Sequence, residues 1–190
     1  MANGRVITGF SAPYVGTYTV SSGTVSYADT MVLARGVSAS VSIDSADDNN
    51  FYADNQIAET ASGTFGSGTL TLTVDGLLTA AEKLILGLPA ENNNWTAYDD
   101  DMDIPYCGVG FVVRYMSDGV TTYVPVVFTK VKFKATGLDA STQEDSIDWQ
   151  TQELEATILR DDTAKHAWKY VGAGQSTEAA AVSLITTKLA

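Results

Sequence analysis

Few side chains in this sequence could carry out covalent chemistry. The chain of 190 residues has one cysteine, Cys107, and one histidine, His166. A zinc site built from Cys and His needs more ligands than these two residues supply. No nucleophile elbow, phosphate-binding loop, metalloprotease motif or dinucleotide fingerprint is found in the sequence. We therefore expect no catalytic residues, no enzyme activity and no cofactor, with His166 in a strand and Cys107 as a small buried side chain.

Two acidic segments are candidate cation-binding loops. The first contains Asp47-Asp48-Asn49-Asn50 followed by Asp54, and the second runs from Asp99 to Asp103. Their oxygens suit calcium, but neither segment has the twelve-residue pattern with a glycine at position six and a closing glutamate. We therefore expect solvated turns and no metal. The alternative is a carbohydrate-binding β-sandwich supported by calcium, because the aromatic residues Trp95 and Tyr98 precede the second segment.

Two adjacent aromatic residues, Phe51 and Tyr52, lie in the first acidic segment, Asp44 to Asn55. Two adjacent aromatic side chains are unexpected in a loop that is exposed only to solvent. At a subunit contact each ring would remove about 150–250 Å² of surface from water. Aromatic anchors inside a polar rim are typical of interfaces. The alternative is that both rings fold back onto their own domain.

The charge balance narrows the range of partners. The chain has 23 acidic and 11 basic residues, so its net charge is −12. This balance argues against a surface that grips nucleic acid or an anionic membrane, because both need clustered cations. The acids are numerous enough to include a glycosidase pair, but none stands in an apolar strand context that would raise its pKa. The length suits one domain, residues 1–190, and the N-terminus lacks the pattern of a secretory signal.

Alternation with a period of two dominates the sequence. Apolar residues alternate with serines over residues 37–44 and with threonines over residues 69–75. Each segment would have one dry and one wet face, as in antiparallel sheets with one solvated side. Three short glycine-containing segments have hairpin length: Ser21-Ser22-Gly23, Gly66-Ser67-Gly68 and Ser117-Asp118-Gly119.

Further elements complete the predicted fold. The longest hairpin spans residues 106–134, and its segment 123–128 is apolar on both faces. Strands are also expected at 147–161, with a change of phase near Glu153, and at 166–171. One helix should begin at a capping box, Thr79 to Glu82, and a second near Ser176 or Thr177. The predicted class is mainly β, an antiparallel β-sandwich or barrel with long hairpins, one flanking α-helix and a C-terminal helix.

Five segments of the sequence, in order along nearly the whole chain, resemble a known family. They are MANGRVITGFSAPYV, ADDNNFYADN, LTLTVDGLLTAAEKLILGLP, WTAYDDDMDIPYCGVGFVVRYMSDGVTTYVPVVFTKVKF and IDWQTQELEATILRDD followed by HAWKY. They are similar to the major tail protein of long-tailed, non-contractile bacteriophages. The resemblance implies a structural virion protein whose β-sandwich assembles into hexameric rings. Stacked rings would form the tail tube that conducts DNA during ejection.

The resemblance also implies partners and roles for particular residues. The expected partners are further copies of the chain, a tape measure protein inside the tube, and tail terminator and distal tail or baseplate proteins. DNA would pass without specific binding, and no membrane is involved. The protein would be made in the host cytoplasm and located in the virion tail. The main alternative within this class is another virion sandwich protein, such as a head decoration or tail-end protein.

Three groups of residues are assigned to assembly on this basis. The segment 44–55 is the expected stacking loop, with inter-ring contacts from Asp47, Asp48, Asn49, Asn50, Phe51 and Tyr52. Acidic candidates for the wall of the bore are Glu59, Asp75, Glu153 and Glu155. Candidates for contacts between subunits are Lys130, Lys132 and Lys134, for which a solvated strand face is the alternative.

Overall fold

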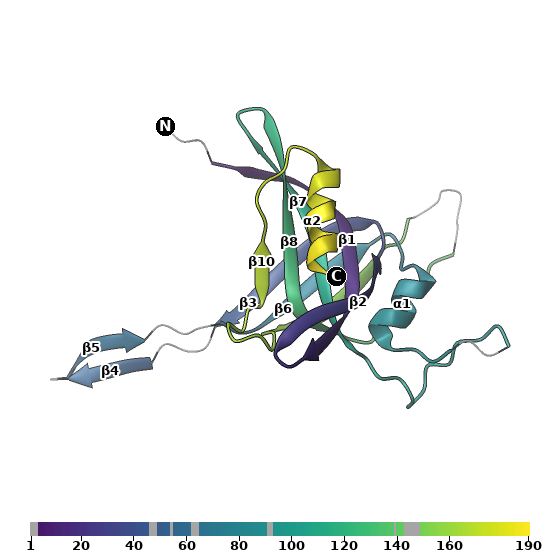
Figure 1. The fold of residues 1–190 in the computed structure, drawn as a ribbon, viewed down its shortest axis with the longest axis horizontal. Coiled ribbons are helices and arrows are strands. Elements are labelled where there is room, and N and C mark those ends of the chain that lie inside the picture. Colours follow the sequence, from purple (N-terminus) through teal and green to yellow (C-terminus); the bar gives the residue numbers. More distant parts are fainter. Residues whose placement is uncertain are drawn as a thin grey trace.

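The chain folds into one large antiparallel sheet with two helices and a separate hairpin (Figure 1). The computed structural model describes residues 4–45, 49–53, 55–61, 65–90, 93–138, 140–142 and 149–190. The strands are β1 (Val6–Ser21), β2 (Thr24–Val32), β3 (Gly36–Ser45), β4 (Asn49–Ala53), β5 (Gln56–Ala61), β6 (Phe65–Val74), β7 (Tyr106–Ser117), β8 (Val120–Phe133), β9 (Gln152–Leu159) and β10 (Lys169–Val171). The helices are α1 (Thr79–Leu86) and α2 (Glu178–Lys188).

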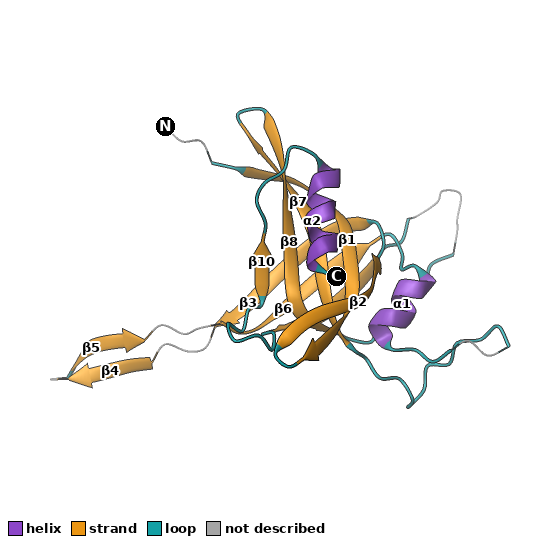
Figure 2. Cartoon of the chain, viewed as in Figure 1, coloured by secondary structure: helices purple, strands orange, loops and turns teal. Residues whose placement is uncertain are grey.

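The strand order confirms the predicted mainly β class. Eight strands form one sheet in the order β2-β1-β7-β8-β9-β6-β3, with β10 paired to β8 (Figure 2). The hairpins β1–β2 and β7–β8 are those predicted around residues 21–23 and 117–119. The sheet folds over so that β3 approaches β1, and a Cβ added to Gly36 would collide with the ring of Phe10. The fold is therefore a single sheet whose two halves enclose one core.

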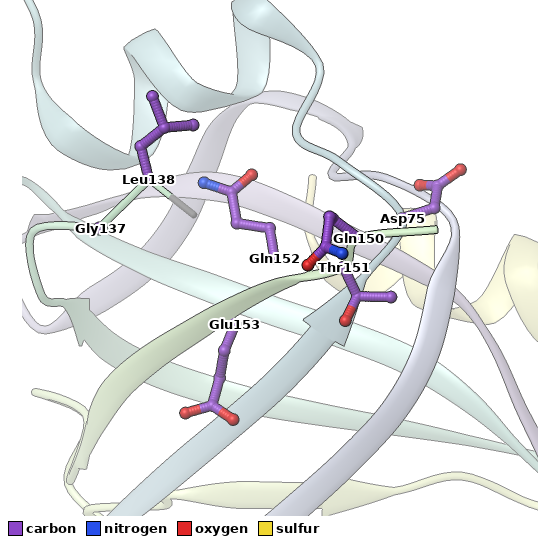
Figure 3. A pocket seen from close by; sticks show the side chains of 7 residues that line it. All are labelled: Asp75, Gly137, Leu138, Gln150, Thr151, Gln152 and Glu153. Atoms are coloured by element: carbon purple, nitrogen blue, oxygen red, sulfur yellow. The ribbon is translucent and has the colours of Figure 1, made fainter. Parts of the chain in front are cut away.

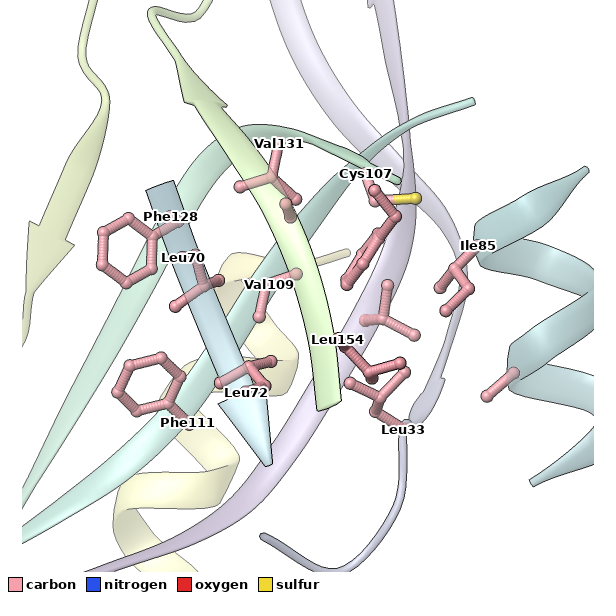
Figure 4. Close-up of a cluster of buried hydrophobic side chains, with 14 of the residues drawn as sticks. Leu33, Leu70, Leu72, Ile85, Cys107, Val109, Phe111, Phe128, Val131 and Leu154 are labelled. Carbon is pink, nitrogen blue, oxygen red and sulfur yellow. The ribbon is translucent and has the colours of Figure 1, made fainter. Parts of the chain in front are cut away.

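Alternation along the strands explains that core (Figure 4). Leu70, Leu72 and Val74 of β6 lie beside Ala156 and Leu154 of β9, and all five side chains are fully buried. Because successive side chains of a strand point to opposite faces, the threonines between them are on the outside. The core also receives residues from β7, β8 and α1, including Val109, Phe111, Phe128, Val131 and Ile85.

Helix α2 covers the outer face of β7 and β8. Its buried residues Ala181 and Ile185 pack against Val112 and Val127 in a second hydrophobic cluster. The close approach requires Gly110, since a Cβ there would collide with Ile185. The second cluster explains why β8 is buried on both faces over residues 124–129, as the sequence predicted for most of this segment. The helix begins near Ser176 or Thr177 as predicted, and its N-cap is Thr177, which accepts a hydrogen bond from the backbone N–H of Ala180.

Helix α1 is present, but its predicted cap is wrong. The N-cap residue is Leu78, which has no side-chain acceptor, and Thr79 is already helical. The helix ends at Gly87, whose φ of 61° is the left-handed conformation favoured at this position. No helix in the described part of the chain is long and apolar enough to cross a membrane.

Three predicted strand boundaries also need correction. Gly66-Ser67-Gly68 is not a turn, because β6 runs through it and Gly68 pairs with Ile43 on one side and Ile158 on the other. The predicted strand 147–161 begins only at Gln152, since that residue pairs with Val74, the last residue of its neighbour β6. His166 has a φ of 49° and lies in a turn before β10, so it is not a strand residue.

The segment 44–55 is not a simple loop. Strand β3 continues through Ser45, and the chain then forms a hairpin of β4 and β5, which pair with each other in a two-stranded sheet. We call residues 49–61 the arm. Figure 1 shows the arm extending away from the large sheet.

A charge on the inner face should unfold the protein. Leu72 is fully buried, so Leu72→Asp should lower the free energy of unfolding by about 4 kcal/mol or more, a large part of the stability of an ordinary domain. Thr69→Asp introduces the same charge on the opposite face of β6 and should remain folded. Circular dichroism and urea denaturation compare the two variants, and a folded Leu72→Asp protein would contradict the assignment of the inner face.

Candidate assembly surfaces

The outer face of β3, β6 and β9 is rich in hydroxyl groups. Cross-strand pairs place Ser38 beside Thr73, Ser40 beside Thr71 and Ser42 beside Thr69. The next strand adds Glu153, Glu155 and Thr157, and β8 adds Lys132. We call this surface the polar face. The Ser38 hydroxyl donates a 2.9 Å hydrogen bond to Thr73 Oγ1, so some of these hydroxyl groups satisfy one another across the strands.

The four acids predicted for a bore wall do not lie together. Glu153 and Glu155 are on the polar face, where they pair with Thr73 and Thr71. Glu59 lies on β5 of the arm, in a separate sheet. Asp75 follows the end of β6 and accepts hydrogen bonds from the backbone and side chain of Arg35, the latter at 2.5 Å. Partial burial acts to raise the pKa of Asp75, but these hydrogen bonds hold that pKa below its usual value.

Asp75 and Glu153 border the same shallow pocket of about 230 Å³ (Figure 3). Thr151 and Gln150 lie nearer Asp75, the Gln152 side chain extends toward Leu138, and the Glu153 carboxylate points away from both. Leu138 is 91% exposed at its border. The pocket thus continues the polar surface beyond the end of β6.

The three lysines predicted for subunit contacts have partners within the chain. Lys130 Nζ is 2.7 Å from Asp162 Oδ2 and lies over the ring of Tyr106. Lys132 lies over the same ring, at 5.3 Å from its centroid, and Lys134 forms an ion pair with Glu155. Glu153 and Glu155 are therefore balanced by Lys132 and Lys134, so the polar face is close to neutral. Whether these lysines also meet acids of a neighbouring subunit stays a prediction.

The Asp162 side chain links the turn before β10 to strand β8 through its contact with Lys130. Besides the bond from Lys130, it accepts a 2.8 Å hydrogen bond from the Tyr18 hydroxyl. These two hydrogen bonds lower the pKa of Asp162, the one from Lys130 most strongly. Burial raises the pKa of Tyr18 to about 12; the hydrogen bond from the Asp162 backbone N–H acts to lower it, and the Asp162 carboxylate acts to raise it. The neighbouring Asp161 is buried and accepts from the backbone and hydroxyl of Thr163.

The two outermost strands of the sheet leave apolar residues uncovered. Among the described strands, β3 pairs only with β6, and β2 only with β1. Val41 and Ile43 of β3 share the inner face with Leu70 and Leu72, yet each is 38% exposed. The predicted dry face of residues 37–43 is thus incompletely covered by this chain. An unpaired strand edge with exposed apolar side chains is a surface for further strand pairing.

The arm holds four of the six predicted inter-ring residues. Asn49, Asn50, Phe51 and Tyr52 form β4, and their register with β5 shifts between Phe51 and Tyr52. Asp47 and Asp48 lie outside the described residues. The predicted loop 44–55 differs from the observed β3, β4 and β5, because the alternation there is too short to distinguish a two-stranded hairpin from irregular structure.

An apolar groove between α2 and β10 was not anticipated from the sequence. Its floor is formed by Pro125 and Val127, and it has a volume of about 470 Å³. The other lining residues are Tyr170, Val171, Gly172, Ala173, Gln175, Leu184 and Lys188. We call this the α2 groove. Its lining comes from three separate segments, so no local pattern in the sequence indicates it.

The second acidic segment shows features of a turn. Asp99 accepts hydrogen bonds through Oδ1 from the backbone of Asp101 and through its carbonyl from that of Met102. Trp95 is 80% exposed, and the Tyr98 hydroxyl donates to Glu82 at 2.9 Å. Within the described ranges, no group of three or more His, Cys, Asp or Glu side chains is placed to hold a metal ion.

Comparisons with models of protein families and with curated protein sequences found no match for this chain.

The interactions of Asp162 should make the free energy of unfolding depend on pH. A carboxylate whose pKa is lowered on folding stabilises the protein fully when the pH is above the pKa in the unfolded chain, about 3.8. This contribution is lost as the pH falls through the lower pKa of the folded protein. Asp162→Asn should therefore be less stable than the wild type near pH 7, and the difference should shrink near pH 3. Urea denaturation at both pH values measures it, and a difference independent of pH would contradict the ion pair.

The single thiol should be unreactive in the folded protein. Cys107 is fully buried, and burial raises its pKa to about 12. Since the thiolate is the reactive form, a thiol reagent should label none of the native protein at pH 8 but one thiol per chain in denaturant. Rapid labelling of the native protein would show that β7 opens readily at this position.

Proposed function

We propose that this chain is a self-assembling structural subunit of a virion, the tail tube protein of a long-tailed, non-contractile bacteriophage. The observation that carries the proposal is the edge of β3 with which no described strand pairs, where Val41 and Ile43 are each 38% exposed. The resemblance of the sequence to the major tail protein family supports it. In this function the chain forms hexameric rings that stack into a tube.

Ring closure would use the two outer strands of the sheet. A monomer normally protects such edges, because unpaired N–H and C=O groups invite pairing with other chains. Here the edge of β3 runs for ten residues, Gly36 to Ser45. Contacts between two different surfaces generate a closed ring when the rotation between copies closes, and an open stack when it does not. One chain can thus supply both the ring contact and the stacking contact.

The polar face suits the wall of a bore. DNA adheres to clustered cations, because phosphate binding releases condensed counterions. On this face serines and threonines predominate, and Lys134 is neutralised by Glu155. Glu153 and Lys132, on the same face, also balance in charge, so the face has no excess of cations to hold phosphates. A wall of this kind lets DNA and a tape measure protein pass without specific binding, while tail terminator and baseplate proteins occupy the two ends of the tube.

Assembly and its dependence on the arm test this function together. Concentrated protein should form rings or tubes of uniform diameter in electron micrographs. Phe51→Ala combined with Tyr52→Ala should block stacking and leave the monomer folded, because the double variant removes both predicted aromatic anchors. Sedimentation measures assembly, and circular dichroism measures folding.

The control variant is Trp95→Ala, which removes an aromatic side chain that is 80% exposed outside the arm. It should assemble as the wild type does. A wild-type protein that stays monomeric at every concentration, with and without other tail proteins, would overturn the proposed function. Normal tubes from the arm variant would overturn only the role of the arm.

A further inference from the structure

The α2 groove is an apolar surface with no occupant in the described part of the chain. Its rim residues Val171, Leu184 and Tyr170 are 59%, 43% and 38% exposed. The floor is fixed, since Val127 is held between Val112 and the buried side of α2, and Gly172 donates a 2.8 Å backbone hydrogen bond to Pro125. A rigid apolar groove of about 470 Å³ is of the size that binds side chains of a partner.

The charge of the groove distinguishes it from the rest of the molecule. Its lining contains one cation, Lys188, and no carboxylate, in a chain whose net charge is −12. The Lys188 ammonium lies 4.0 Å from the centroid of the Tyr170 ring, so it is held at the rim. A partner with apolar rings beside carboxylates would match both properties of this surface.

The arm and its connection to β3 have that composition. Residues 44–55 contain four aspartates, no lysine or arginine, and the adjacent pair Phe51 and Tyr52. The arm strands belong to a two-stranded sheet separate from the large one (Figure 1). We propose that the α2 groove receives the arm of a second copy of this chain, with Lys188 facing an aspartate of residues 44–55. This inference rests on the proposed function and adds the receiving surface for the stacking contact.

The two surfaces are different parts of the chain, and this has a consequence for assembly. A contact between an arm and a groove is heterologous, so each copy keeps one unused arm or groove after binding one neighbour. Such a contact extends without limit when the rotation between copies does not close, as the stacking of rings requires. The groove lies on the outer face of β8, whereas the polar face lies beyond it on β9, β6 and β3, so the arm contact leaves the polar face free.

Charge reversal in the groove tests the proposal. Leu184→Glu and Lys188→Glu each place a carboxylate where the acidic arm would bind, and each should raise the protein concentration needed for tubes at least about 10-fold while rings persist. The matched control is Ala179→Glu, which adds the same charge to an exposed position of α2 outside the groove lining. Circular dichroism should show all three variants folded.

A direct measurement uses a carbodiimide, which joins an amine and a carboxylate in contact with loss of water. In wild-type tubes it should link Lys188 of one copy to an aspartate within residues 44–55 of another, identified by mass spectrometry. Tubes that form without this link, and equally well from both groove variants and the control, would overturn the docking site while leaving the tube function intact. A wild-type protein that forms neither rings nor tubes would overturn the proposed function, and the docking site with it.

Discussion

Burial of one face of a single folded sheet is the interaction on which the rest of the structure depends. Leu72 and Leu154 lie side by side on that face and are completely buried. The sheet brings β3 over β1 at one end, where Gly36 leaves room for the ring of Phe10. Towards the other end of β3, Ile43 lacks such a cover. The folding that forms the core thus leaves the edge of β3 partly exposed, and this exposed edge is the basis for proposing assembly.

The outer face of the sheet divides into two regions with different physical properties. Over β7 and β8, α2 adds an apolar layer through Ile185 and leaves the α2 groove beside it. Over β9, β6 and β3, the surface consists of hydroxyl groups and nearly balanced charges. An apolar, weakly cationic groove favours lasting contacts with an acidic partner, whereas a nearly neutral hydroxyl surface does not hold phosphates. In the proposed function, one chain would combine self-contact through the groove with a surface past which DNA could move.

Local charge pairs also limit what the lysines can do. Lys130 is held by Asp162 and by the rings of Tyr18 and Tyr106, so its charge supports the turn that leads to β10. β10 in turn supplies Tyr170 and Val171, which form one wall of the α2 groove. The ion pair between Lys130 and Asp162 thus stabilises the segment that forms the groove wall, although neither side chain lines the groove.

Elements with long alternation could be predicted from the amino-acid sequence alone. The hairpins β1–β2 and β7–β8, the buried face of β6 and the start of α2 near Thr177 follow from local side-chain preferences, so they could be predicted. Features that depend on a neighbouring strand could not be predicted in this way. Strand β9 begins at Gln152 because its neighbour β6 ends at Val74. Strand β6 continues through two glycines because Ile43 and Ile158 pair with Gly68. Long-range packing places Glu59 apart from Glu153 and gives the lysines partners within the chain. It also created the α2 groove, because cross-strand register and helix packing join residues that are far apart in the sequence.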